Sequence, residues 1–168
     1  MMDDSFEYMK MLVLAMFACL LVGCATPQGD MRLRDEDDIL ESVFCYQFSH
    51  NPSSLQQKAG AYYLSLGENA HDPSDLFMQR FAGYAPPVRK VSRSKFDPSV
   101  LRGRIVDTET GEQGLIFMVK SIKWFTATEV WVNGGYYQNG LASSGHTYTV
   151  QKKNGRWSVV KAKLRWIS

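Results

Sequence analysis

The spacing of apolar side chains predicts an amphipathic helix over residues 35–50. Asp35 is the expected N-cap, acidic residues fill the first turn, and Asn51-Pro52 stops the helix. Five apolar side chains fall on one face of this helix: Ile39, Leu40, Val43, Phe44 and Phe48. We expect this face to cover a sheet.

A strand and a second helix are expected next. Residues 58–67, "KAGAYYLSLG", are rich in tyrosine and end at a glycine, which favours a strand. The second helix is expected over residues 72–84, with Asp72 as its cap, Pro73 at its first position and Gly83 past its end. Its buried side is expected to consist of Leu76, Phe77 and Phe81.

From Val88 onward, alternating apolar and polar positions predict β-strands. The expected strands cover residues 87–94, 103–108, 114–125, 128–137, 146–152 and 156–167. Turn-rich sequence separates them, and Asn154-Gly155 is typical of a tight hairpin, so an antiparallel meander is predicted. The last strand should have one apolar and one basic face: Val160, Ala162, Leu164 and Trp166 against Lys161, Lys163 and Arg165.

Two helices before a run of strands predict an α+β fold, with the two N-terminal helices packed on a curved antiparallel sheet. This order of elements resembles the half-open cone of the NTF2-like fold, with the cystatin-like roll as its nearest relative. Residues 148–159, "YTVQKKNGRWSV", resemble the penultimate hairpin of many small bacterial domains of this kind. We expect residues 35–168 to form a single domain.

The N-terminal residues have the pattern of a signal peptide. Residues 11–21, "MLVLAMFACLL", are almost wholly apolar, but they are about half as long as the roughly 20 residues that span a bilayer. Lys10 precedes them and supplies the positive charge that is typical just before the apolar h-region of a signal peptide. Acidic side chains further upstream favour Met9 over Met1 as the true start: Asp3, Asp4 and Glu7.

The sequence "LVGC", Leu21 to Cys24, resembles the lipobox of bacterial lipoproteins, whose cysteine is lipidated and becomes the mature N-terminus. The resemblance implies a signal peptide over residues 1–23, diacylglyceryl and palmitate chains on Cys24, and a lipidated tether over residues 24–34. Several acyl chains anchor a protein stably to a membrane. Ala25 replaces the aspartate that marks inner-membrane retention in this family, which implies the outer membrane, facing the periplasm.

The charge of the mature chain argues against nucleic acid as a partner. Of 19 basic and 17 acidic side chains, 18 and 14 remain after the signal peptide is removed, a balance of +4, because Lys10, Asp3, Asp4 and Glu7 are lost. The basic stretch over residues 152–165 is expected to be a solvated strand face, or to attract anionic headgroups, lipopolysaccharide or peptidoglycan acids.

Candidate chemistry is sparse. Recognised catalytic signatures are missing from the sequence, so no catalytic residue, cofactor or metal site is expected. Carboxylates occupy helix first turns and a solvated turn, the latter holding Asp107, Glu109 and Glu112. The histidines lie in separate segments without metal-ligand spacing: His50, His71 and His146. Cys45 has no disulfide partner once Cys19 is removed and Cys24 is acylated, and it is expected to be a small buried hydrophobe.

Four side chains are candidates for ligand contact, although large rings on strands more often belong to a core. His146 shares strand parity with Tyr148, so both could point into a cone. Tyr136 and Tyr137 stand in "VNGGYYQNG", where paired glycines favour an exposed loop with two aromatic anchors. The alternative for this segment is a long hairpin turn.

Three functions remain open at the level of sequence. The first is a non-enzymatic envelope lipoprotein that binds an envelope protein or a small ligand. The second is a small-molecule enzyme that uses His146 and Tyr148 inside the cone. The third is an inhibitor or immunity protein that blocks a periplasmic enzyme through residues 133–140. The lack of a catalytic motif and of a buried acid–base pair favours the first.

Overall fold

The computed structural model describes residues 27–168. The expected signal peptide and the lipobox with Cys24 therefore lie outside the described residues. Asp35–Ser168 form one compact unit. In the part of the chain that is described, the helices are all too short or too polar to cross a bilayer.

The first described element is α2, Pro27–His50, which begins earlier than the sequence predicts. Residues 27–34, expected in the tether, are helical, because proline suits the first helical position and charged residues are compatible with a helix. Asp35 is consequently in the third turn and is not the N-cap. Its carboxylate instead accepts hydrogen bonds from Lys152 Nζ at 2.5 Å and from Trp157 Nε1 at 2.9 Å.

The predicted apolar face of α2 is confirmed. Ile39, Val43, Phe44 and Phe48 are buried in the main core, and Leu40 packs against it. The Phe48 ring lies 4.9 Å from the rings of both Tyr62 and Phe117, measured between centroids. Each fully buried side chain of this kind contributes about 1.5–3 kcal/mol, so this face holds α2 against the sheet.

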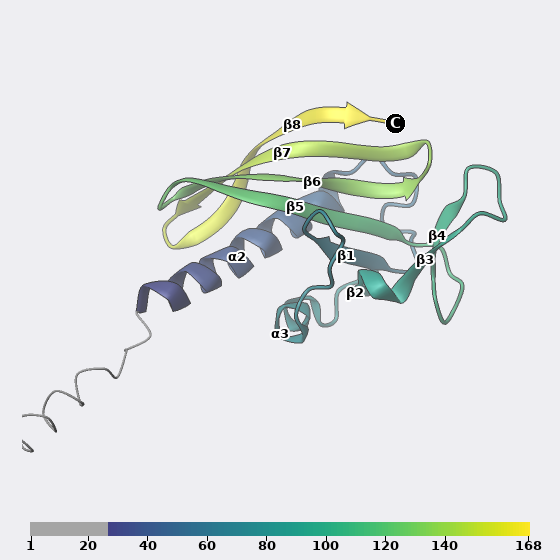
Figure 1. Ribbon diagram of the computed structural model, residues 1–168, viewed down its shortest axis with the longest axis horizontal. Coiled ribbons are helices and arrows are strands. Elements are labelled where there is room, and N and C mark those ends of the chain that lie inside the picture. Colours follow the sequence, from purple (N-terminus) through teal and green to yellow (C-terminus); the bar gives the residue numbers. More distant parts are fainter. Residues whose placement is uncertain (1–26) are drawn as a thin grey trace, which may run out of the picture. The chain divides into compact units, whose positions relative to one another are not determined.

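The described residues contain one six-stranded sheet with the strand order β2-β1-β5-β6-β7-β8 (Figure 1). The strands β5 to β8 are antiparallel neighbours, which confirms the predicted meander. The sheet as a whole is mixed, because β1 pairs in parallel with both β2 and β5. The strand bounds are Tyr62–Leu66 for β1, Val88–Lys90 for β2, Leu115–Thr126 for β5, Glu129–Asn139 for β6, Ala142–Lys153 for β7 and Arg156–Ile167 for β8.

The expectation of a purely antiparallel sheet was wrong because of a crossover. The chain leaves β1, passes through α3, Asp75–Met78, and the 3-10 turn η2, Gln79–Phe81, and returns as β2. Such a connection brings the second strand back in the same direction as the first. The crossover segment is also less helical than the sequence predicts.

The start of α3 differs from the prediction as well. Ser74 is the N-cap and its hydroxyl accepts from the Phe77 N–H, whereas Asp72 accepts from the N–H of Ser92. Phe77 and Phe81 are buried, as predicted, but Leu76 is 72% exposed. The α+β class is therefore confirmed, with one long helix and one short helix beside the sheet.

A second, smaller sheet lies among the described residues. It pairs β3, Ser94–Asp97, with β4, Arg104–Asp107, in antiparallel register. The predicted strand over residues 87–94 is thus divided between β2 and β3, with the short turn η3, Val91–Arg93, between them.

Two irregularities in β8 change the faces predicted for this strand. The register with β7 shifts between Thr149 and Val150 and again between Gly145 and His146. Each shift is a β-bulge, which reverses the inward and outward alternation beyond it. As a result Trp166 pairs with Gly145 and lies on the same face as the basic side chains. It does not share the apolar face of Leu164, although the sequence predicted that it would. Figure 1 shows β8 bending along its length.

Candidate functional site

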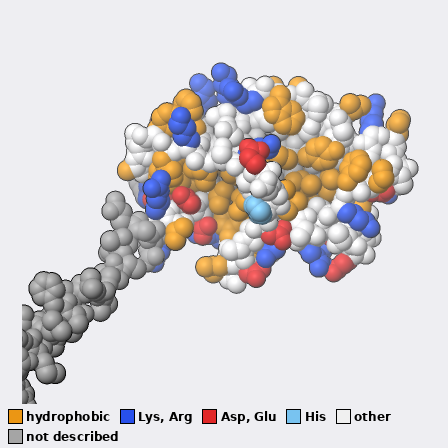
Figure 2. Space-filling view, viewed as in Figure 1, with side chains coloured by type: hydrophobic (Ala, Val, Ile, Leu, Met, Phe, Trp, Pro, Cys, Tyr) orange, Lys and Arg blue, Asp and Glu red, His pale blue; other side chains and the backbone are white. Residues whose placement is uncertain are grey.

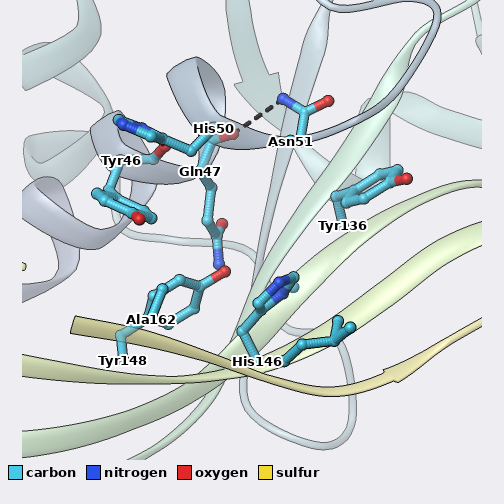
Figure 3. A pocket seen from close by; sticks show the side chains of 10 residues that line it. Tyr46, Gln47, His50, Asn51, Tyr136, His146, Tyr148 and Ala162 are labelled. Atoms are coloured by element: carbon cyan, nitrogen blue, oxygen red, sulfur yellow. Dashed lines mark hydrogen bonds between the residues drawn. The ribbon is translucent and has the colours of Figure 1, made fainter.

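A cavity of about 240 Å³ lies between the C-terminal end of α2 and the sheet (Figure 3). Helix α2 and the residue that follows it supply one wall, and β6, β7 and β8 supply the other. The lining consists of Tyr46, Gln47, His50, Asn51, Gly135, Tyr136, His146, Tyr148, Ala162 and Leu164. No aspartate, glutamate, lysine or arginine is among them.

A glycine in β6 lets α2 place a polar side chain against the sheet. A Cβ atom on Gly134 would lie 2.2 Å from the Met118 carbonyl oxygen and 3.1 Å from Gln47 Nε2. Without that atom, Gln47 Nε2 reaches the Met118 oxygen and donates a hydrogen bond at 3.1 Å. The Asn51 side-chain amide also donates to the Gln47 main-chain oxygen at 2.9 Å, which is the dashed line in Figure 3.

The Gln47 side chain has an unsatisfied acceptor in this cavity. The residue is only 3% exposed, and its Oε1 atom is buried with no hydrogen-bond partner among the described residues. A buried acceptor without a donor costs about 1–3 kcal/mol. Native proteins satisfy nearly all such atoms, so a donor from a bound molecule or water is expected at this position.

Tyr148 and His146 stand side by side on β7, opposite Gln47 (Figure 3). Burial raises the pKa of Tyr148 to about 12, opposed by a side-chain hydrogen bond with Gln47, so its hydroxyl is protonated at neutral pH. Burial lowers the pKa of His146, so its imidazole is neutral. The two rings are stacked with centroids 5.7 Å apart, and His146 Nδ1 lies 3.5 Å from Ser144 Oγ.

The helix side of the cavity is a stacked pair of rings. Tyr46 and His50 are one helical turn apart, and their rings lie parallel with centroids 4.0 Å apart. His50 Nδ1 is 3.0 Å from the Tyr46 main-chain oxygen, which fixes the imidazole. His50 was not among the ligand candidates predicted from the sequence, and the structure places it in the cavity wall.

Of the four predicted ligand residues, the structure brings three together. His146, Tyr148 and Tyr136 line the cavity. Tyr137 does not, because alternate strand residues face opposite sides; it packs against a second core cluster formed by Ala61, Tyr63 and Ile105.

The interpretation of residues 132–140 as an exposed loop was wrong. Residues up to Asn139 belong to β6, and Tyr136 is only 5% exposed. Paired glycines here mark close backbone approach within a sheet: a Cβ atom on Gly135 would lie 1.9 Å from the Ser144 oxygen. Tyr136 therefore cannot be a surface anchor for a partner protein.

Sequence reasoning missed the contribution of α2, although one signal was present. Gln47 lies four residues after Val43 and three after Phe44, so it occupies the apolar stripe of the helix. A glutamine at a core position is unusual and deserves a ligand hypothesis.

The possible metal ligands and Cys45 are consistent with a structural role. Among residues 32–168, no group of three histidine, cysteine, aspartate or glutamate side chains is arranged to hold a metal ion. Cys45 is half-buried and packs against the main core, and burial raises the pKa of its thiol. Its thiolate is therefore disfavoured at neutral pH.

No protein-family model matches this chain, and comparisons with curated proteins and with solved structures gave no significant match. The geometry of the cavity and the pattern of the sequence consequently carry the functional argument.

Proposed function

We propose that the protein is a bacterial envelope lipoprotein whose domain binds a small uncharged ligand in the cavity beside α2. The lipid anchor is supported by the apolar run after Lys10 and by the lipobox-like sequence that ends at Cys24. Cleavage before Cys24 leaves a mature chain held by acyl chains, at the outer membrane and facing the periplasm.

We also propose that the domain is a divergent member of the NTF2-like or cystatin-like folds. The support is the long helix α2, whose apolar face packs on a four-stranded meander. The parallel pairing of β1 and the shortness of α3 are departures from the expected pattern.

The observation that carries the binding proposal is the unsatisfied Gln47 Oε1. A ligand that completes this site must donate a hydrogen bond to that oxygen, for example from a hydroxyl or an amide N–H. The lining has no carboxylate, ammonium or guanidinium group to pair with a charged ligand, and the rings of Tyr46, Tyr136 and Tyr148 favour a flat or apolar body. The volume of about 240 Å³ suits a molecule smaller than a typical drug.

Binding is better supported than catalysis. A histidine and tyrosine that act as an acid–base pair need a hydrogen bond and a pKa near the working pH. Tyr148 and His146 are stacked instead, and a pKa of about 12 disfavours proton transfer by the Tyr148 hydroxyl. The inhibitor hypothesis has no support from the geometry, since residues 133–139 are part of a strand.

Native mass spectrometry of the full-length chain, purified from bacteria in mild detergent, tests both parts of the proposal. We expect a mature mass that begins at an acylated Cys24, with a small adduct that leaves on gentle activation. Gln47→Leu should lose the adduct and keep the acylated mass. Gln79→Leu, which alters an exposed glutamine away from the cavity, should keep both.

The two parts fail separately. A chain that retains its first 23 residues would contradict the lipoprotein assignment. An adduct that survives in Gln47→Leu, or a folded wild type without any adduct, would contradict binding at Gln47. Circular dichroism of each variant establishes that the fold is intact before the masses are compared.

A further inference from the structure

The sheet carries a second groove on the face turned away from α2. Strand register places Lys123, Trp131, Thr149 and Lys161 in one row across β5, β6, β7 and β8. The neighbouring row contains Ser121, Asn133, Thr147 and Lys163. These positions alternate with the buried Val130 and Val132, so they point outward. All of them except Ser121 border a groove of about 400 Å³.

The floor of the groove is a preorganised row of polar groups. Asn133 Nδ2 donates to Ser121 Oγ at 3.1 Å, and Thr147 Oγ1 donates to Asn133 Oδ1 at 2.8 Å. These bonds fix three side chains across three adjacent strands. Asn133 and Thr147 line the groove and retain hydrogen-bonding capacity toward it, because an amide has two donors and a hydroxyl has two lone pairs.

An aromatic ring stands in the same groove. Trp131 is 43% exposed although it is one of the largest side chains in the chain. The Phe125 ring supports it at a centroid distance of 4.3 Å, so the indole is held in place and is not free to collapse onto the sheet. A fixed, exposed indole is a typical contact anchor.

Basic side chains line both banks of the groove and acidic ones are missing. Lys123 lies on β5, and Lys161, Lys163 and Arg165 lie on β8. Over residues 32–168, none of these four cations has an ion-pair partner, whereas other basic residues such as Arg80 and Arg104 do. Figure 2 shows Lys and Arg side chains gathered at the top of the view, over β8. The groove therefore presents an uncompensated positive field.

We propose that this groove binds an anionic glycan, meaning a sugar chain that carries carboxylate or phosphate groups. The lysines and Arg165 match the anionic groups, since charge-assisted hydrogen bonds are the strong ones. Asn133 and Thr147, held in place by the row of hydrogen bonds that begins at Ser121, match sugar hydroxyls. The exposed face of Trp131 offers an apolar surface to the C–H face of a sugar ring. This site is separate from the cavity beside α2 and does not depend on its ligand.

Two other anionic partners fit the groove less well. Single-stranded nucleic acid is bound by a succession of stacking rings, whereas Trp131 is the one aromatic side chain that lines this groove. An anionic bilayer needs protruding apolar side chains beside the cations. Phe125 and Trp166 are exposed on this face, but its centre is a hydrogen-bonded polar row that would have to lose water without gaining partners in lipid. Both partners are included as outcomes of the test.

The test is a titration of the full-length chain in non-ionic detergent with defined probes. We expect binding to oligogalacturonate or to phosphorylated mannan oligosaccharides, weakening as salt is added, and at least tenfold weaker binding to neutral maltoheptaose. The double variant Lys161→Gln/Lys163→Gln should lose about tenfold in affinity and much of the salt dependence. Trp131→Ala should lose a similar factor and keep the salt dependence.

The matched control is Lys58→Gln/Lys95→Gln, which removes the same charge from two exposed lysines outside the groove. It should bind as the wild type does. Equal losses in the control, equal binding of the neutral glycan, or binding of neither anionic probe would overturn the proposal. Tighter binding to oligo-dT or to micelles containing phosphatidylglycerol than to either anionic glycan would also overturn it.

Discussion

At the scale of single residues, Asp107 is a buried carboxylate outside the cavity that accepts four hydrogen bonds. Its side chain is 1% exposed, and its carboxylate accepts from the Tyr63 hydroxyl at 2.9 Å and from Arg89 at 2.5 Å. The backbone N–H groups of Glu109 and Thr110 also donate to it. Burial alone would raise the pKa of Asp107, but these donors hold it well below its usual range.

This network predicts a loss of stability in acid. The folded-state pKa of Asp107 is depressed below the unfolded value of about 3.9, so its contribution is complete above that pH and is lost as the pH falls further. Urea denaturation at pH 7 and at pH 3 should show this fall in the wild type. Asp107→Asn should lower the free energy of unfolding at pH 7 by at least about 2 kcal/mol.

The same variant should show a smaller fall between pH 7 and pH 3, because its side chain no longer titrates. Asp75→Asn, which alters a carboxylate that is 91% exposed, is the control and should behave as the wild type. If Asp107→Asn and wild type lost equal stability in acid, the pH dependence would belong to other groups.

The role of a single residue could be predicted only where the neighbouring sequence indicates it. Gln47 could have been found, because a polar side chain interrupts an apolar helical stripe. Asp107 was expected in a solvated turn, and nothing local could have shown otherwise, since Tyr63 and Arg89 are 44 and 18 residues away. Tyr136 and Tyr137 pack on opposite faces of β6, against the cavity and against the second core cluster, and both partners come from segments distant in the sequence.

At the scale of elements, one carboxylate joins α2 to the β7–β8 hairpin. Asp35 accepts from Lys152 on β7 and from Trp157 on β8. Asp35→Ala should remove both bonds and lower the free energy of unfolding by about 1–2 kcal/mol, since both donors are largely shielded from solvent. Hydrogen exchange should become faster in this hairpin first, because its tie to the helix is lost.

Asp37→Ala, which changes the same residue type two positions along α2, controls for helix propensity. It should leave exchange in the hairpin unchanged. Uniformly faster exchange across the whole sheet in Asp35→Ala, without a preference for β7 and β8, would contradict this role for Asp35.

Elements defined by local periodicity were predicted well and elements defined by long-range pairing were not. The stripe of α2 and the meander of β5 to β8 followed from intervals of three, four and two residues. The parallel pairing of β1 with β5 depends on residues about 50 positions apart. The bulges in β8 have no signature in the alternation of valine, lysine and tryptophan, so the outward position of Trp166 could not be predicted.

At the scale of the whole molecule, the sheet of Asp35–Ser168 has two faces with opposite chemistry. The face against α2 borders a cavity without carboxylate, ammonium or guanidinium groups, whereas the other face carries a cationic groove. The cavity and the groove both follow from strand alternation, because successive side chains of β6 and β7 point to opposite faces of the sheet. We therefore expect the two proposed ligands, a small uncharged molecule and an anionic glycan, to bind without competing with each other.

The lipid anchor is the remaining whole-molecule prediction, and the three cysteines of the chain make it directly testable. Cells fed an alkyne analogue of palmitate should label the wild type, and Cys24→Ser should abolish the label. Cys45→Ser should be labelled normally, since this thiol packs against the core and is not an acylation site. A chain begun at Met9 should be labelled as fully as one begun at Met1, because Lys10 and the apolar run remain.

At about 0.8 kcal/mol per buried methylene, several acyl chains should also keep the wild type in the membrane fraction through a high-salt wash. Label that persists in Cys24→Ser, or a wild type that salt releases, would exclude this anchor and leave the groove to act from solution.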